Sequence, residues 1–146
     1  MQTATAGSII VPQTIVVDVW RLTMNDFPEF MKNPVNKVVS NAQYTKGIEG
    51  YVFDGVDGSQ MGFWTNAEGG KSTVHTHTYD EYVVVVQGQY TVIVGEIEFP
   101  LTAGKEFLIK QGTPHSGKST PGTRTIHAFG GKRAERAKKE GACAPS

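Results

Sequence analysis

The stretch between Gly69 and Gly88 constrains this chain more than any other part of its sequence. It contains His75 and His77, two positions apart, and Glu81 four positions further on. Side chains at positions i and i+2 of an extended chain leave the same face. The stretch therefore predicts two neighbouring imidazoles on one face of a β-strand.

A third histidine, His115, follows a Gly-Thr-Pro turn, and strand dimensions decide how the four residues can meet. His75 and His77 are about 6.6 Å apart along a strand, at about 3.3 Å per residue, and two converging imidazoles can span that separation. Glu81 would lie about 13 Å beyond His77 on a straight strand, so the chain must turn at residues 78–80. Three imidazoles and one carboxylate suit a divalent transition metal, whether Fe, Mn, Ni, Cu or Zn.

Length, charge and cysteine content exclude several classes of protein. The 146 residues are enough for one domain with a core and too few for two. The 14 basic and 14 acidic residues balance, and no recognition helix is visible, so we expect neither nucleic acid nor membrane as a partner. The single cysteine, Cys143, cannot form an internal disulfide, and the first residues lack the basic region of a signal peptide. These features predict a cytoplasmic protein.

Short β-strands are predicted along the chain from Gly50 onward, because runs rich in Val, Ile, Phe and Tyr alternate with glycines. The dipeptide Asp57-Gly58 predicts a type I′ hairpin turn between the first two strands. The expected strands cover residues 51–56, 60–65, 72–77, 81–87, 90–94, 106–110, 115–118 and 123–129.

The chain is expected to have three parts within one domain. Residues 1–48 form an arm packed on the barrel, with a strand at 15–20 and a short helix at 26–32 that cannot run far past Pro34. Residues 49–130 form a β-barrel. Residues 131–146 form a charged C-terminal tail, in which basic and acidic side chains alternate.

Two sequence motifs, at residues 69–88 and 104–115, resemble those of the cupin superfamily. The first reads Gly-x5-His-x-His-x3-Glu-x6-Gly and resembles the first cupin motif in full. The second reads Gly-x5-Lys-x-Gly-x2-His and resembles the second motif. Lys110 stands where the family usually has proline, and Ser119 stands where an asparagine is often found. With its flanking strands, the resemblance covers about residues 50–130.

The resemblance implies a jelly-roll β-barrel of two antiparallel sheets, with a metal inside and one end open to a small molecule. The metal ligands would be His75, His77, Glu81 and His115. Cupins are usually dimers or higher oligomers, so the resemblance also implies a homodimer. It implies a range of activities rather than one, because a fold does not determine a function.

His127 is the candidate catalytic residue. On the expected strand 123–129 it shares a face with Thr125 and Phe129, and Arg124 lies on the other face. If the face of His127 looks into the barrel, this residue is placed to bind a substrate or to transfer a proton. If it looks outward, a structural histidine is the better interpretation.

Two classes of function stay open. Four protein ligands on an octahedral ion leave two positions for water, dioxygen or a chelating metabolite. This favours a metal-dependent enzyme that acts on a small polar metabolite, with a dioxygenase-like oxidoreductase ahead of a sugar-acid isomerase or lyase. The scarcity of other acids and bases near the motifs favours a metal- or metabolite-binding module without turnover. An inward-facing His127 would favour the enzyme, and an outward-facing one would favour the binding module.

Overall fold

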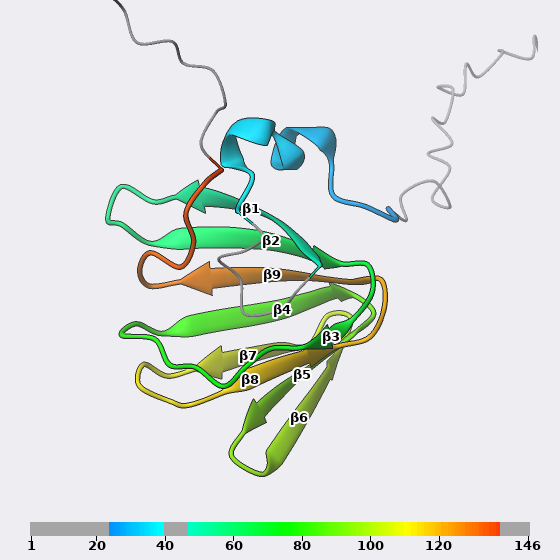
Figure 1. Ribbon diagram of the computed structural model, residues 1–146, viewed down its shortest axis with the longest axis vertical. Coiled ribbons are helices and arrows are strands. Elements are labelled where there is room, and N and C mark those ends of the chain that lie inside the picture. Colours follow the sequence, from blue (N-terminus) through cyan, green and yellow to red (C-terminus); the bar gives the residue numbers. More distant parts are fainter. Residues whose placement is uncertain (1–23, 40–46, 138–146) are drawn as a thin grey trace, which may run out of the picture.

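Two antiparallel β-sheets make up most of the computed structural model, which describes residues 24–39 and 47–137 (Figure 1). The five-stranded sheet has the order β1-β2-β9-β4-β7, and the four-stranded sheet has the order β3-β8-β5-β6. The strands are β1 (Ile48–Asp54), β2 (Gln60–Asn66), β3 (Gly70–Lys71), β4 (Glu81–Gln87), β5 (Gln89–Val94), β6 (Ile97–Thr102), β7 (Glu106–Ile109), β8 (Ser116–Ser119) and β9 (Thr123–Phe129).

The predicted jelly-roll of two antiparallel sheets is confirmed, but the barrel is not closed. No pair of strands joins the two sheets within residues 24–39 and 47–137. The sheets instead pack face to face through apolar side chains. Val83 and Val85 of β4 and Val92 of β5 are almost completely buried there, as expected for alternate positions that face a partner sheet. The four predicted metal ligands lie between the same two layers.

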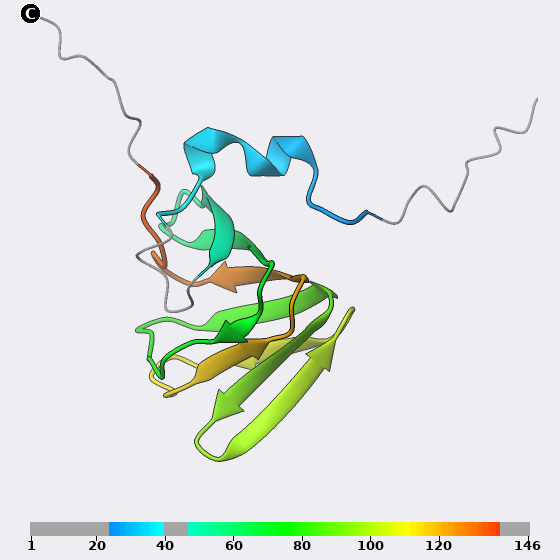
Figure 2. The ribbon, with the colours of Figure 1, turned by 45° about the vertical axis from the view of Figure 1, so that its right-hand side comes forward.

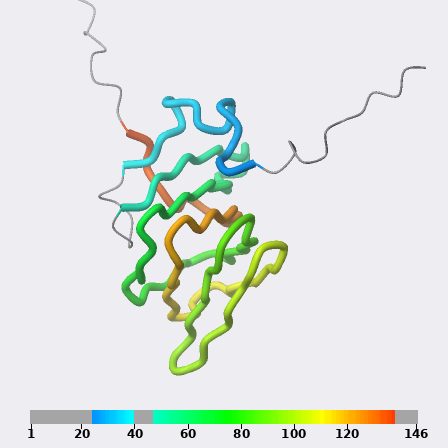
Figure 3. The backbone as a smooth tube through the Cα atoms, turned by 90° about the vertical axis from the view of Figure 1, so that its right-hand side faces the viewer, coloured from blue at the N-terminus to red at the C-terminus, as the bar shows by residue number. Residues whose placement is uncertain are grey.

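Most predicted strands occur within a few residues of their expected bounds, and β4 and β9 match them at both ends. The strand expected at residues 72–77 is wrong, because that segment crosses from one sheet to the other and makes only an isolated bridge, between His75 and His115. Strand β6 was missed because it contains Pro100, which argues against a strand. Proline is tolerated there because β6 is the edge of its sheet, in the β5–β6 hairpin at the bottom of Figure 3.

The type I′ turn expected at Asp57-Gly58 is also wrong. Residues 55–59 form a five-residue loop between Asp54 and Gln60, which are partners in the β1–β2 ladder. A type I′ turn needs positive φ at both central residues. Gly58 has a φ of 84°, but no described residue other than glycine has a positive φ. Asp57 instead accepts a hydrogen bond from the backbone N–H of Ser59, at 3.0 Å.

The N-terminal arm lies above β1 and contains two short 3-10 turns, η2 (Glu29–Lys32) and η3 (Pro34–Asn36) (Figure 2). The helix expected at residues 26–32 is therefore a single 3-10 turn that starts three residues later. The strand expected at residues 15–20 lies outside the described residues. Phe27 anchors the arm, because its ring packs edge-on against Phe63 of β2 with centroids 5.8 Å apart. No described helical segment is long and apolar enough to cross a membrane.

The described part of the C-terminal segment, residues 131–137, is packed against the five-stranded sheet. Gln60 of β2 holds it, because Oε1 accepts hydrogen bonds from the backbone N–H groups of Arg133 at 2.6 Å and Ala134 at 2.9 Å. Ala134 is 5% exposed, and Arg136 bridges to Val38 of the arm. This packing fixes the backbone that carries Arg133. The predicted division of the chain into three parts, at residues 48 and 131, stays a proposal.

Candidate metal centre

Four side chains from three parts of the fold meet between the sheets. His75 and His77 lie on the segment that crosses from β3 to β4, Glu81 begins β4, and His115 directly precedes β8. The chain bends at residues 78 and 79, as strand dimensions require. One potential ligand atom from each residue lies within 4.8 Å of the others. The structure thus brings together all four predicted ligands.

Backbone carbonyls orient two of the imidazoles. His75 Nδ1 lies 2.9 Å from the carbonyl oxygen of Thr73, and His115 Nδ1 lies 2.8 Å from that of Thr113. A carbonyl can only accept a hydrogen bond, so Nδ1 carries the proton and the lone pair of each neutral ring is on Nε2. The third ring, His77, stacks on Tyr79 with centroids 5.0 Å apart. A hydrogen bond from the second ring nitrogen, as His75 and His115 make through Nδ1, is typical of histidines that bind metals.

Two buried polar atoms in the group lack hydrogen bonds within the described residues: His77 Nε2 and Glu81 Oε2. They approach each other to 3.0 Å without hydrogen-bond alignment, and His115 Nε2 lies 3.3 Å from the same oxygen. Leaving such atoms buried without partners is costly, and most native proteins avoid it. A cation coordinated by both atoms would satisfy them. The donor set of three imidazoles and one carboxylate therefore fits a divalent transition metal.

The surroundings adjust the charges of these side chains. Burial lowers the pKa of His75 to about 4, so its ring is neutral at pH 7. Burial alone would raise the pKa of the Glu81 carboxyl, but three neighbouring imidazoles outweigh it and hold that pKa far below its usual range. Burial would likewise lower the pKa of His115, but the Glu81 carboxylate raises it. A neutral imidazole and an ionised carboxylate are the forms that bind a metal.

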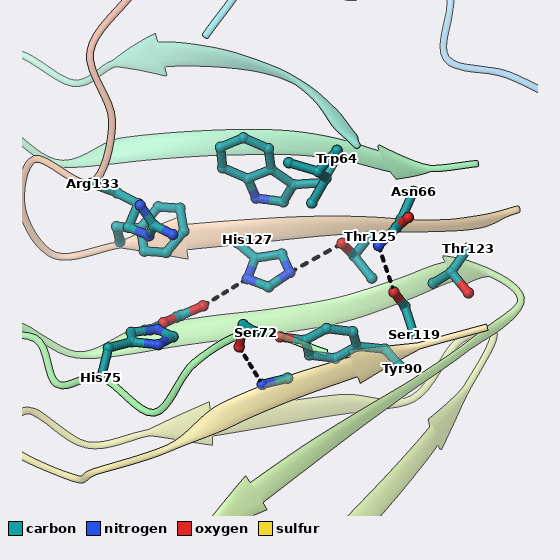
Figure 4. Close-up of a pocket in the computed structure, with 14 residues that line it drawn as sticks. Trp64, Asn66, Ser72, His75, Tyr90, Ser119, Thr123, Thr125, His127 and Arg133 are labelled. Atoms are coloured by element: carbon teal, nitrogen blue, oxygen red, sulfur yellow. Dashed lines mark hydrogen bonds and ion pairs between the residues drawn. The ribbon is translucent and has the colours of Figure 1, made fainter. Parts of the chain in front are cut away.

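Two of the four residues, His75 and Glu81, line a cavity of about 60 Å³, enough for several waters or part of a small ligand. His75 and Arg133 lie toward one end of it, and Asn66 and Thr123 toward the other (Figure 4). His127 lines its middle and is 6% exposed, so the face of β9 that carries His127 looks inward.

Comparisons with known proteins agree with this geometry. Residues 62–128 match the cupin domain family. Solved structures that resemble the chain include an RmlC-like cupin from Shewanella frigidimarina NCIMB 400, with 20% identity and a TM-score of 0.54, over 67% of this chain and 84% of that one. KdgF from Halomonas sp. has 21% identity and a TM-score of 0.52, over 64% of this chain and 83% of that one. The chain therefore contains a cupin domain, at residues 62–128. No curated protein matches the sequence.

This cupin departs from the family pattern at two positions, and the structure gives each a local partner. Lys110, in place of the usual proline, forms an ion pair with Asp80, just before Glu81. Ser119, in place of an asparagine, accepts a hydrogen bond at 2.8 Å from the side-chain amide of Asn66, on β2. Asn66 and Ser119 both line the cavity, so the side-chain amide there comes from β2 and not from position 119.

Sequence reasoning missed two residues that line the cavity of this cupin, Asn66 and Arg133. Asn66 lies at the end of β2 on the same face as Trp64, so strand alternation gave a signal that was not used. The sequence predicts Arg133 to lie in the charged C-terminal tail. Nothing local marks it, because its place depends on the hydrogen bonds of Gln60, which is 73 positions away in the sequence.

Proposed function

We propose that this cupin holds one divalent transition metal through His75, His77, Glu81 and His115, and that it uses the metal to act on a small polar metabolite in the cavity. The observation that supports this most directly is the buried pair of atoms without hydrogen bonds, His77 Nε2 and Glu81 Oε2, in a cluster of imidazoles beside a cavity. A bound ion of Fe, Mn, Ni, Cu or Zn would supply Lewis acidity or redox chemistry.

The lining of the cavity favours an anionic metabolite. Of the described residues that line it, Glu81 alone carries a carboxylate, and Arg133 adds a guanidinium near the Phe129 ring, 5.8 Å from its centroid. A divalent ion would leave the region with a net positive charge, which attracts anions. Hydroxyl groups of Ser72 and Thr125 line the same space and suit a hydroxylated molecule. A dioxygenase-like oxidoreductase or a sugar-acid isomerase or lyase fits these features.

A binding or sensing module without turnover is the second candidate. The observation in its favour is that both ring nitrogens of His127, the predicted catalytic residue, are engaged: Nδ1 with Glu81 at 2.7 Å and Nε2 with Thr125 at 3.0 Å. Proton transfer to a metabolite would require one of these contacts to break. The inward position of His127 favours the enzyme. The hydrogen bonds at both of its ring nitrogens favour the module.

Two further proposals come from the sequence: that the protein is a homodimer and that it is cytoplasmic. Sedimentation velocity of the purified chain over a range of concentrations tests the first. A species of twice the chain mass is expected, and a monomer at all concentrations would contradict it.

The metal site is tested by elemental analysis of the purified protein and its variants. Wild type should carry close to one transition-metal ion per chain, whereas His75→Ala and His115→Ala should carry almost none. Lys118→Ala changes an exposed side chain on β8 and is the matched control, with full metal content expected. Normal metal content in both histidine variants would refute the assignment.

Turnover is tested next, with the metal-loaded protein and a panel of sugar acids and phenolic acids. Oxygen consumption and product formation detect the oxidoreductase, and a change of substrate structure without oxygen consumption detects the isomerase or lyase. Binding of a panel member with no product would favour the module.

A further inference from the structure

The two oxygens of the Glu81 carboxylate have different surroundings. Oε2 faces the Nε2 atoms of His77 and His115, at 3.0 and 3.3 Å. Oε1 points the other way and lies 2.7 Å from Nδ1 of His127. Glu81 and His127 are 5% and 6% exposed, so water does not compete freely for this contact. One oxygen of the carboxylate therefore faces the proposed histidine ligands, and the other faces His127 on β9.

The direction of the hydrogen bond between Glu81 and His127 follows from chemistry. An ionised carboxylate can only accept, so His127 Nδ1 donates. The Thr125 hydroxyl, 3.0 Å from His127 Nε2, can then donate to that nitrogen of the neutral ring. The dashed lines in Figure 4 follow this row from the carboxylate through His127 to Thr125. Thr125 thus favours the tautomer that gives Glu81 its hydrogen bond.

The fold holds the His127 ring in place. Strand β9 pairs with β4 so that His127 lies opposite Val83, two positions from Glu81. The rings of Trp64 and Tyr90 pack edge-on against the imidazole, with centroids 6.4 and 5.6 Å away. Packing on these sides leaves the ring little freedom to turn away from the carboxylate.

We propose that His127 is a positioning residue: it engages Glu81 Oε1 so that the carboxylate binds the metal through Oε2 alone, and Thr125 fixes its tautomer. A carboxylate can bind a metal through one oxygen or both. With four protein ligands, binding through one oxygen would leave two positions of a six-coordinate ion for other ligands, and binding through both oxygens would leave one. This inference rests on the proposed metal site but not on turnover.

The test uses metal binding and spectroscopy of the full chain. His127→Leu removes the donor, and we expect the affinity for Co²⁺ to fall about 10–100-fold, as is usual when a hydrogen bond to a metal ligand is lost. His127→Asn keeps an N–H donor at the δ position and should retain most of the affinity. The visible absorption of bound Co²⁺, which responds to ligand number and geometry, should change in His127→Leu and stay close to wild type in His127→Asn.

Thr125 supplies a milder pair of variants that leaves the ring in place. Thr125→Val keeps the side-chain shape but removes the hydroxyl, and it should weaken Co²⁺ binding about 2–10-fold, the value of one neutral hydrogen bond. Thr125→Ser should restore it. These two variants decide the question even if His127→Leu does not fold, and thermal melting of each metal-free variant checks folding.

The inference would be overturned by wild-type affinity and spectrum in His127→Leu, by wild-type affinity in Thr125→Val, or by equal losses in His127→Asn and His127→Leu. Equal losses in the two His127 variants would mean that the ring matters for packing and not for its hydrogen bond. If the wild-type chain binds no metal, both this inference and the metal site fail. If it binds metal but turns nothing over, only the enzymatic function fails.

Discussion

The pKa values of two proposed ligands, His75 and His115, are shifted in opposite directions. Burial lowers the pKa of His75 to about 4, whereas the contact with the Glu81 carboxylate outweighs burial and raises the pKa of His115. At a pH near 6, the metal-free protein is thus expected to have a neutral His75 and a largely protonated His115. A metal must displace the proton of His115 but not one from His75.

Titration of the metal-free protein tests this difference. The imidazole signals in NMR spectra should show His75 neutral down to about pH 4, and His115 protonating above its ordinary value of 6.5. The affinity for metal should fall as the pH drops through the raised pKa of His115, because protons compete at that ring. His75→Ala and His115→Ala assign the signals. Protonation of His75 near pH 6.5 would contradict the prediction.

The lowered pKa of His75 also affects stability. The unfolded chain binds a proton at His75 near pH 6.5, whereas the folded chain resists protonation until about pH 4. The contribution of His75 to folding is therefore fully present above pH 6.5 and is lost as the pH falls toward 4. His115, with its raised pKa, contributes in the opposite direction.

At the scale of residues, the four proposed ligands were predictable because their spacing is a property of one short stretch and one turn. The inward side of β9 could not be chosen from sequence, because alternation says only that His127 and Thr125 share a face. The row of hydrogen bonds from Glu81 to Thr125 depends on the β4–β9 register. Two strands that begin 42 positions apart set that register, and no local pattern encodes it.

At the scale of elements, strands were predictable where apolar runs pair with glycine turns, as in β4 and β9. The crossing segment at residues 72–77 misled the prediction because its alternation resembles that of a strand. Alternation reports which way side chains point and not whether the backbone has partners on both sides. The C-terminal segment was mispredicted for a different reason. Its charges predict an exposed tail, but Gln60 accepts hydrogen bonds from its backbone and holds it against the sheet.

The hold of Gln60 on the C-terminal segment can be measured. Gln60→Leu leaves the backbone N–H groups of Arg133 and Ala134 without their acceptor, and a buried unpaired donor costs about 1–3 kcal/mol. We expect the free energy of unfolding in urea to fall by about 2–4 kcal/mol, which is less than twice the full cost because the hydrogen bond of the Arg133 N–H is only partly buried. Hydrogen exchange at the Ala134 amide should accelerate at the same time.

The control for this prediction is Gln111→Leu, which changes an exposed glutamine in the loop before β8. It should alter neither the unfolding free energy nor the exchange of Ala134. Equal behaviour of the two variants would show that Gln60 does not hold the segment. Weaker binding of anions in Gln60→Leu would further connect this segment, through Arg133, to the cavity.

At the scale of the whole molecule, the four proposed ligands lie where the two sheets are connected. Glu81 belongs to the five-stranded sheet, and His115 leads into β8 of the four-stranded sheet. His75 and His77 lie on the segment that passes between the sheets. Because no strand pairing joins the two sheets within residues 24–39 and 47–137, a metal bound to all four would be a direct link between the layers.

Metal binding should therefore stabilise the entire fold rather than a single loop. At a free metal concentration about 1,000 times Kd, binding to the folded state alone adds about 4 kcal/mol. For a domain of this size that corresponds to a rise in Tm of roughly 10–20 °C, to be measured by calorimetry of the chelator-treated and reloaded protein. His115→Ala should melt at the same temperature with and without metal, because its ligand set is incomplete. An equal rise in the Tm of His115→Ala would show that the stabilising ion binds elsewhere, because this variant lacks the proposed ligand that adjoins the four-stranded sheet.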